Sequence, residues 1–216
     1  MNAVADKVDP IRLLRDGVNV KPLVAQLEAH PELWDDNVFR TERPRQPKPR
    51  RGQKKAAESP HGKISDIIVR FNDWKHWTGD RAAFGAEHDS VWWPAYEKLT
   101  YVKPLVFDLM RMFYAERLGM VLITRIPPHC NVAKHVDTGW HAGHYLKFGV
   151  QVAAARGQKF CYEGCSLETA AGDLFAFDNS RVHWVENPTD EERITMIVCL
   201  RLEGAHARDT TYRGRN

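Results

Sequence analysis

The chain has 216 residues, of which 43% are hydrophobic and 27% charged, with a formal net charge of +3. This balance favours a soluble globular protein, and the length suffices for one domain with a sizeable core, expected over residues 1–216. No apolar run approaches the roughly 18 residues that span a bilayer. Met1–Lys7 also lacks the basic start and apolar stretch of a signal peptide. We therefore expect a cytoplasmic protein with no membrane partner.

In the first 40 residues we expect a helical segment. Asp9 as N-cap and Pro10 at the first helical position predict a short helix that begins near Ile11. A second helix is predicted over Pro22–Ala29, with its leucines on one face.

Positive charge is concentrated between residues 40 and 63, where nine Lys/Arg and two Asp/Glu give a local charge of +7. Three prolines between Arg43 and Gly52 disfavour a helix or a central strand, so we interpret residues 41–63 as a mobile loop. Its Arg43–Lys55 run could neutralise nucleic-acid phosphates. No aromatic residue interleaves it for base stacking, however, and a solvated loop is the simpler interpretation.

Beyond this segment, Ile64–Phe71 has the composition of a strand. Apolar residues at helical spacing predict a helix from Lys103 or Pro104 to Arg117, which Gly119 ends. Short β segments follow, namely Met120–Ile126, Tyr145–Ala154, Gln158–Glu163, Asp173–Phe177, Val182–Glu186 and Arg193–Leu202. Helices followed by a run of short strands predict an α+β, mainly β fold, a β-sandwich or jelly roll buttressed by helices. Its core would cover residues 64–202, with a C-terminal tail over 203–216.

His135, Asp137 and His183 have the chemistry of a mononuclear iron(II) site. Two imidazoles and one carboxylate on one face of the ion leave three positions open for a cosubstrate, oxygen and substrate. Side chains two apart on an extended segment point the same way, so His135 and Asp137 can both face one metal. His183 lies on a later predicted strand. We therefore expect these three residues to bind a metal.

Arg193 begins the last predicted strand. Ile194, Met196, Val198, Leu200 and Leu202 share one face, which we expect to pack under helices. Arg193 shares the other face, which points into the barrel, where an unpaired guanidinium is unfavourable. A guanidinium suits a bidentate bond to a carboxylate, here that of a dicarboxylate cosubstrate. A salt bridge to Asp190, Glu191 or Glu192 is an equally good alternative from the sequence.

Other interpretations of these residues exist. A lone histidine is more often a surface or core residue than a ligand, and Asp137 could form a turn. His129, Cys130, His141 and His144 are rival ligands, and His30-Pro31-Glu32 is the one HxE. A three-histidine site would leave Asp137 and Arg193 without a role. The four cysteines, Cys130, Cys161, Cys165 and Cys199, include no CxxC, so we expect reduced, mostly buried thiols.

Several blocks of the chain carry a family resemblance: Trp34–Arg40, Ile67–Arg70, Ile126–His129 leading to His135-Val136-Asp137, Gly172–His183, and Arg193. Together they resemble the aspartyl/asparaginyl β-hydroxylase-like group of iron(II)- and 2-oxoglutarate-dependent dioxygenases. The resemblance covers residues 34–202 and is strongest over residues 172–193.

The resemblance implies a double-stranded β-helix, with His135 and His183 as metal ligands and Arg193 on the far carboxylate of 2-oxoglutarate. Some members lack the carboxylate ligand, whereas this chain has Asp137. The family's Arg-x-His pair is replaced by Tyr145-x-Lys147 before Gly149, and Lys147 is a candidate for the near carboxylate.

The implied reaction is hydroxylation coupled to decarboxylation, with release of succinate and CO2. The cofactors expected are Fe(II) and 2-oxoglutarate, with ascorbate as a further candidate. Trp140, Phe148 and Trp184 are candidates for the pocket wall, although such residues more often belong to the plain core. The expected substrate is a peptide or a free amino acid. The alternatives are a nucleic acid or nucleotide, and a catalytically inert jelly-roll binding module.

Overall fold

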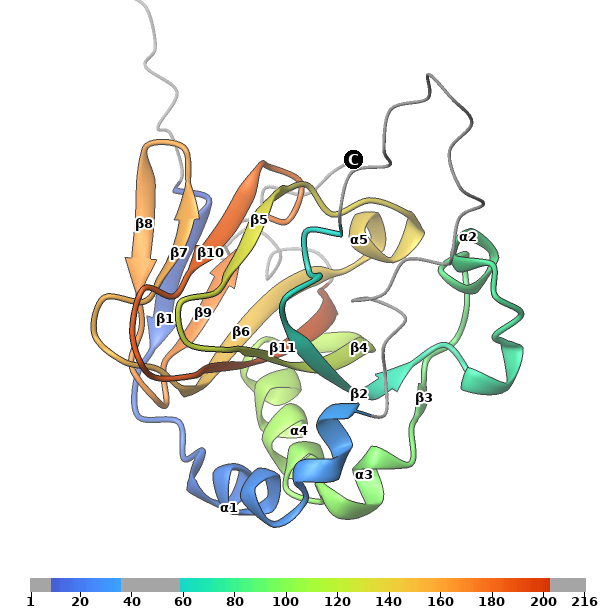
Figure 1. Ribbon diagram of the computed structural model, residues 1–216. Coiled ribbons are helices and arrows are strands. Elements are labelled where there is room, and N and C mark those ends of the chain that lie inside the picture. The colour runs from blue at the N-terminus through green and yellow to red at the C-terminus, as the bar shows by residue number, and fades with distance from the viewer. Residues whose placement is uncertain (1–8, 36–58, 203–216) are drawn as a thin grey trace, which may run out of the picture.

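The computed structural model describes residues 9–35 and 59–202. Two antiparallel sheets face each other (Figure 1). The larger has the strand order β1-β9-β6-β11-β4-β2-β3 and the smaller β5-β10-β7-β8. The strands are β1 (Ile11–Arg15), β2 (Ser65–Phe71), β3 (Val91–Trp92), β4 (Ala115–Ile126), β5 (Asn131–His135), β6 (Leu146–Ala153), β7 (Lys159–Tyr162), β8 (Cys165–Glu168), β9 (Leu174–Phe177), β10 (His183–Glu186) and β11 (Arg193–Leu202). This arrangement confirms the predicted jelly roll.

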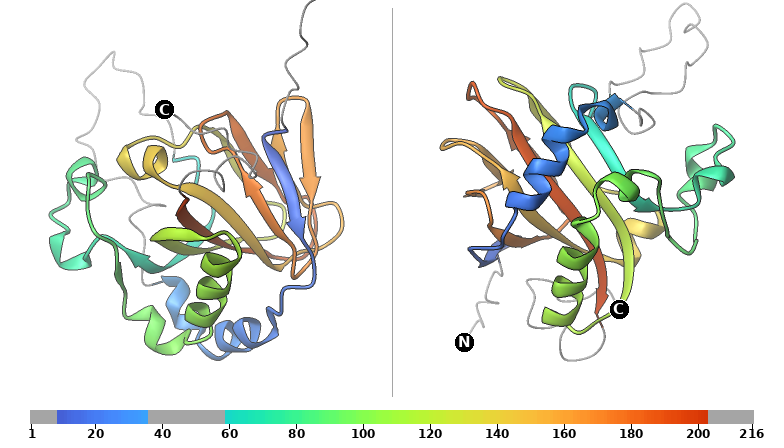
Figure 2. Two further views of the ribbon diagram at one scale, coloured as in Figure 1. Left: turned by 180° about the vertical axis from the view of Figure 1, so that it is seen from behind. Right: turned by 90° about the horizontal axis from the view of Figure 1, so that it is seen from below.

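Short helices surround the sheets. They are α1 (Lys21–Ala29), α2 (Arg81–Phe84), α3 (Ala95–Lys98), α4 (Val102–Met112) and α5 (Trp140–His144), with 3₁₀ turns at Pro31–Asp35 and Trp74–His76. Helices α1, α3 and α4 lie against the outer face of the larger sheet (Figure 2). No helix in the described ranges is a candidate for crossing a bilayer. Most of the predicted basic loop, including Arg43–Lys55, and the predicted tail lie outside those ranges.

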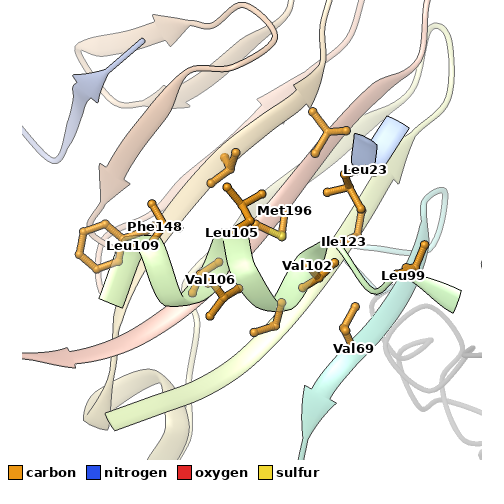
Figure 3. Packing of buried hydrophobic residues seen from close by; sticks show 14 of the residues in the cluster. Leu23, Val69, Leu99, Val102, Leu105, Val106, Leu109, Ile123, Phe148 and Met196 are labelled. Carbon is orange, nitrogen blue, oxygen red and sulfur yellow. The ribbon is translucent and has the colours of Figure 1, made fainter. Parts of the chain in front are cut away.

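The main core lies between α4 and the larger sheet (Figure 3). Val102, Leu105, Val106 and Leu109 recur on one face of α4 and are buried. They meet the outward residues of β11, including Met196, as the alternation along this strand predicts. Burial of this apolar surface, at about 25 cal/mol per Å², stabilises the packing of α4 on the larger sheet.

Two predicted helices differ from the structure. Residues 11–15 form β1, because Ile11 pairs with Phe177 at the sheet edge and sheet pairing overrides the local Asp-Pro signal. Helix α4 ends at Met112, since Tyr114 adopts a positive φ of 50° and the chain enters β4. Gly119 therefore does not end a helix. It lies inside β4, where an added Cβ would come within 2.8 Å of His141 Nε2.

Candidate metal and cosubstrate site

His135 and His183 are brought together by strand pairing. His135 ends β5 and His183 begins β10, and the two residues face each other in the antiparallel register of the smaller sheet. Their ring centroids are 4.3 Å apart. Asp137 follows two residues after His135, and its backbone N–H donates to Asn179 O at 3.1 Å. The HxD segment and a distant strand therefore supply one cluster. Strand β5 was not predicted.

One potential ligand atom from each of His135, Asp137 and His183 lies within 4.8 Å of the others. His135 Nε2 is 3.7 Å from Asp137 Oδ1, and His183 Nε2 is 3.9 Å from Asp137 Oδ2. Each histidine Nδ1 contacts a backbone carbonyl, that of Ala133 at 2.8 Å or Arg181 at 2.9 Å. A carbonyl only accepts, so Nδ1 carries the proton and Nε2 keeps its lone pair. The cluster could therefore hold a divalent metal.

The electrostatics of the cluster favour ligand forms of these groups. Burial alone would raise the pKa of Asp137, but Lys147, His183 and His135 together hold that pKa well below its usual range. The Lys147 ammonium lies 2.6 Å from Asp137 Oδ2. Burial lowers the pKa of His183, which favours its neutral imidazole. An ionised carboxylate and a neutral imidazole are the forms that bind metal.

Arg193 lies inside the barrel with only 1% of its surface exposed. Nη1 donates to Thr169 Oγ1 at 3.1 Å, whereas Nη2 is buried and has no hydrogen-bond partner among the described residues. Burial lowers the pKa of Arg193 to about 10, which leaves the guanidinium charged at pH 7. A buried charged donor without a partner is unfavourable and marks a place for an anion.

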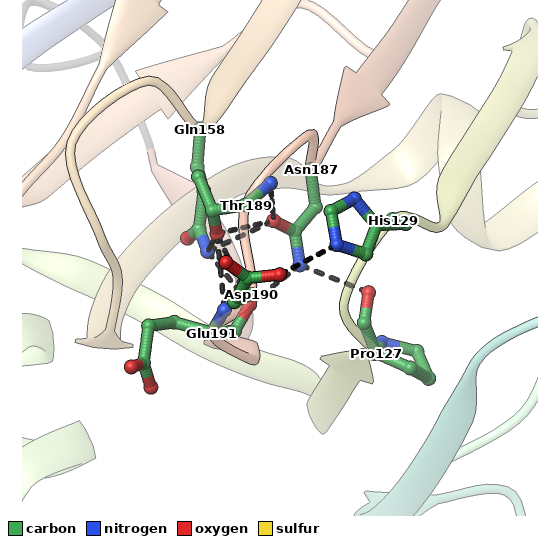
Figure 4. Close-up of polar contacts among 7 residues, drawn as sticks. All are labelled: Pro127, His129, Gln158, Asn187, Thr189, Asp190 and Glu191. Carbon is green, nitrogen blue, oxygen red and sulfur yellow. Dashed lines mark hydrogen bonds and ion pairs between the residues drawn. The ribbon is translucent and has the colours of Figure 1, made fainter.

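The turn before β11 does not neutralise Arg193. Asp190 accepts from His129 Nε2 at 2.8 Å, and Glu192 lies 3.8 Å from Arg125. The turn is fixed instead by the fully buried Asn187 and Gln158, whose side-chain amides bond to each other at 3.0 Å (Figure 4). Asn187 Nδ2 also donates to the carbonyls of Ile126, Pro127 and Glu191. The salt-bridge alternative for Arg193 is thus not formed within the described residues.

A single cavity connects the three-residue cluster with Arg193. Its wall includes Lys147, Thr124 and Thr195 as polar groups. Most of the remaining wall is apolar, formed by Ile64, Met120, Ile126, Val132, Phe160, Phe175, Phe177, Val185 and Ile197. Charged groups in the wall of a largely apolar cavity suit a small dianion that contacts both the cluster and Arg193.

The three aromatic candidates for the pocket wall lie outside the residues that line the cavity. Phe148 stacks on Phe113 in the outer core, Trp140 on His144, and Trp184 lies under Lys134. Phe160, Phe175 and Phe177 take this role instead. The alternation of Phe175 and Phe177 with Leu174 and Ala176 along β9 is a signal that could have found two of them.

Gly149 makes room for Phe175. A Cβ at position 149 would lie 2.2 Å from Phe175 Cζ, far inside van der Waals contact. Gly149, two residues after Lys147, is therefore needed so that the Phe175 ring can line the cavity.

The rival ligands lie elsewhere. His129 is paired with Asp190, and His144 contacts Arg201 at 3.1 Å. His141 Nε2 accepts from the Met120 backbone N–H at 3.0 Å, and His30 contacts Glu32. None of these histidines, nor Cys130, joins the described ligand cluster. All four cysteines are free thiols, as expected.

A family model described as aspartyl/asparaginyl beta-hydroxylase matches residues 68–201, which is more than half of the chain. The chain belongs to this family. As a member of the aspartyl/asparaginyl β-hydroxylase family, the protein is one of the 2-oxoglutarate- and iron(II)-dependent dioxygenases. A search of curated proteins finds no match.

Solved structures agree with the jelly-roll fold. A prolyl hydroxylase from Trichoplax adhaerens, in complex with a hypoxia inducible factor oxygen degradation domain peptide fragment, is 11% identical with a TM-score of 0.50, covering 93% of this chain and 87% of that chain. A viral collagen prolyl hydroxylase from Paramecium Bursaria Chlorella virus-1, as a 2OG complex, is 9% identical with a TM-score of 0.50, covering 93% of this chain and 99% of that chain. At these identities the likeness concerns the fold alone.

Proposed function

We propose that this protein is an Fe(II)- and 2-oxoglutarate-dependent hydroxylase that acts on a C–H bond of a peptide side chain or a free amino acid and releases succinate and CO2. The observation that carries the proposal is the cavity that joins the His135–Asp137–His183 cluster to the unpartnered Nη2 of Arg193. A metal site alone has many uses, but a metal site that shares a cavity with a buried guanidinium lacking a counter-ion among the described residues fits a 2-oxo dicarboxylic acid.

His135, Asp137 and His183 would hold Fe(II) through two imidazole Nε2 atoms and one carboxylate. The donor set fits because both Nε2 lone pairs face the carboxylate. When bound, the ion supplies the oxygen-activating chemistry, and the protein supplies ligand geometry and a dry site. The backbone carbonyls of Ala133 and Arg181 fix the orientation of the two rings.

Arg193 would bind the distal carboxylate of 2-oxoglutarate with the donor that now lacks a partner. Lys147, at the metal end of the same cavity, would contact the near carboxylate. The phenylalanines that line the cavity would exclude water from the cosubstrate, which strengthens both charge pairs.

The peptide or amino-acid substrate is supported by the family description, which names aspartyl and asparaginyl residues. The exposed Val136 and Val182, which adjoin the proposed ligands in sequence, offer an apolar rim for a substrate side chain. A nucleic-acid substrate is supported only by the charge of residues 40–63. Nucleic-acid affinity at low salt that falls as salt rises would favour this alternative.

The test is succinate formation from 2-oxoglutarate in the presence of Fe(II) and ascorbate, with peptide pools, amino acids and oligonucleotides supplied separately. The expected result is oxygen-dependent succinate, raised by a peptide or amino-acid pool, and lost in His135→Ala. Metal and 2-oxoglutarate binding are measured alongside, because turnover without substrate is slow. A protein that binds neither Fe(II) nor 2-oxoglutarate would instead be an inert binding module.

A further inference from the structure

Two buried polar side chains, those of Thr169 and Gln151, form a hydrogen-bonded series with the Arg193 guanidinium. Arg193 Nη1 donates to Thr169 Oγ1 at 3.1 Å, and Thr169 Oγ1 donates to Gln151 Oε1 at 2.9 Å. Gln151 is fully buried and Thr169 is 4% exposed. Thr169 lies outside the residues that wall the cavity, so its hydroxyl reaches the site only through the guanidinium.

The direction of these hydrogen bonds is fixed by the Gln151 amide. Its Nε2 donates to two backbone carbonyls, Ala153 O at 2.7 Å and Ile194 O at 2.8 Å. Carbonyls only accept, so the amide oxygen must face the hydroxyls of Thr169 and Thr195. Thr169 therefore gives its single hydrogen to Gln151 and turns a lone pair toward Arg193.

Gln151 also bridges an irregularity in the sheet next to Arg193. The pairing of β11 with β6 shifts register there, with Ile194 opposite Ala153 and Thr195 opposite Gln151. Such bulges change the direction in which nearby side chains point. Gln151 therefore holds two neighbours of Arg193 in place. Its amide nitrogen bonds to the backbone carbonyl of Ile194, and its amide oxygen bonds to the Thr169 hydroxyl.

We propose that Gln151 and Thr169 are positioning residues that aim Arg193 Nη2 at the distal carboxylate of the cosubstrate, and so set the affinity and selectivity for a dicarboxylic 2-oxo acid. This inference rests on the proposed function. A long side chain held in one orientation before binding loses less freedom when the ligand arrives. Thr169 occupies Nη1 and leaves Nη2, which has no partner among the described residues, as the donor available to a ligand in the cavity that Arg193 lines.

The test measures binding, not turnover, on the full chain loaded with Mn(II). Two ligands are compared by calorimetry: 2-oxoglutarate, and 2-oxopentanoate, which carries a methyl group where 2-oxoglutarate has its distal carboxylate. Thr169→Val removes the hydroxyl at nearly constant volume, and Thr169→Ser keeps it. We expect Thr169→Val to weaken 2-oxoglutarate binding about tenfold, as for a lost hydrogen bond to a charged group. Binding of 2-oxopentanoate should change less than about twofold, and Thr169→Ser should stay near wild type.

A double-mutant cycle separates positioning from general loosening. In an Arg193→Met background, Thr169→Val should have no further effect on 2-oxoglutarate binding. Thermal unfolding checks each variant, and Thr169→Ala replaces Thr169→Val if the latter does not fold. Unchanged 2-oxoglutarate affinity in the hydroxyl-free variant, or an equal loss for both ligands, overturns the positioning role. Wild-type protein that binds neither ligand overturns the proposed function itself.

Discussion

The two faces of β11 have opposite roles, since one packs in the apolar core and the other lines the cavity. Met196, Val198 and Leu200 point outward and are buried under α4 in an entirely apolar core. Arg193, Thr195 and Ile197 point inward and line the cavity, where a charge is kept without a counter-ion among the described residues. Burial of the outward apolar side chains stabilises the fold, whereas burial of the Arg193 charge destabilises it. A site that must bind an anion is therefore built on a strand that the opposite face stabilises.

The inner face gives the largest expected effect. His183→Ala removes one of three proposed ligands, so affinity for Mn(II), measured by anaerobic calorimetry, should fall by more than about 100-fold. His129→Ala is the control, since its exposed imidazole bonds only to Asp190 among the described contacts. Equal metal affinity in the two variants would place the metal elsewhere.

Substitutions in the core that covers the outer face of β11 should change the stability of the protein and not its affinity for metal. Leu109→Ala deletes a side chain that is 1% exposed. It should lower the free energy of unfolding in urea by about 3 kcal/mol, because a cavity forms under α4. Phe107→Ala, on the exposed side of the same helix, should change it by less than about 0.5 kcal/mol. A loss of Mn(II) affinity in folded Leu109→Ala would show that the two faces are not independent.

Gly149 tests how closely the cavity wall is packed. Gly149→Ala places a methyl group against Phe175, which should lower the free energy of unfolding by about 1–3 kcal/mol and weaken 2-oxoglutarate binding. Phe175→Leu in the same chain should recover part of the stability. If the double variant is no more stable than Gly149→Ala, the contact with the ring is not the cause.

The smallest effect, taken per pH unit, is a pH dependence of stability from His141. Burial, with neighbouring Lys147, lowers its pKa to about 3 from a usual value near 6.5. The unfolded chain therefore takes up a proton first as pH falls, so stability is full above about pH 6.5 and falls toward pH 3. His141→Gln should flatten urea-derived stability curves in this window by up to about 1.4 kcal/mol per pH unit. Parallel curves for the two proteins would contradict the assignment.

The difference between the faces also explains what the sequence could predict. Alternation along residues 193–202 predicted the outer core and the inward Arg193, because a period of two is a local property. The meeting of His135, Asp137 and His183 was expected from their chemistry, and strand register brings them together. Strand β1 depends on pairing between distant segments, and so was missed. Phe175 and Phe177 were missed although the alternation along β9 is local. The Gln151–Thr169 chain depends on a sheet irregularity that no local pattern records.

One divalent ion and one dicarboxylate are proposed to share the cavity that contains the two histidines and Arg193. A crystal structure of the protein grown anaerobically with Fe(II) and 2-oxoglutarate tests it most directly. We predict a metal about 2.0–2.2 Å from His135 Nε2, His183 Nε2 and an Asp137 oxygen. The distal carboxylate should lie within hydrogen-bond distance of Arg193 Nη2. A metal bound outside this cluster, or a 2-oxoglutarate whose distal carboxylate avoids Arg193, would rule out the proposed site.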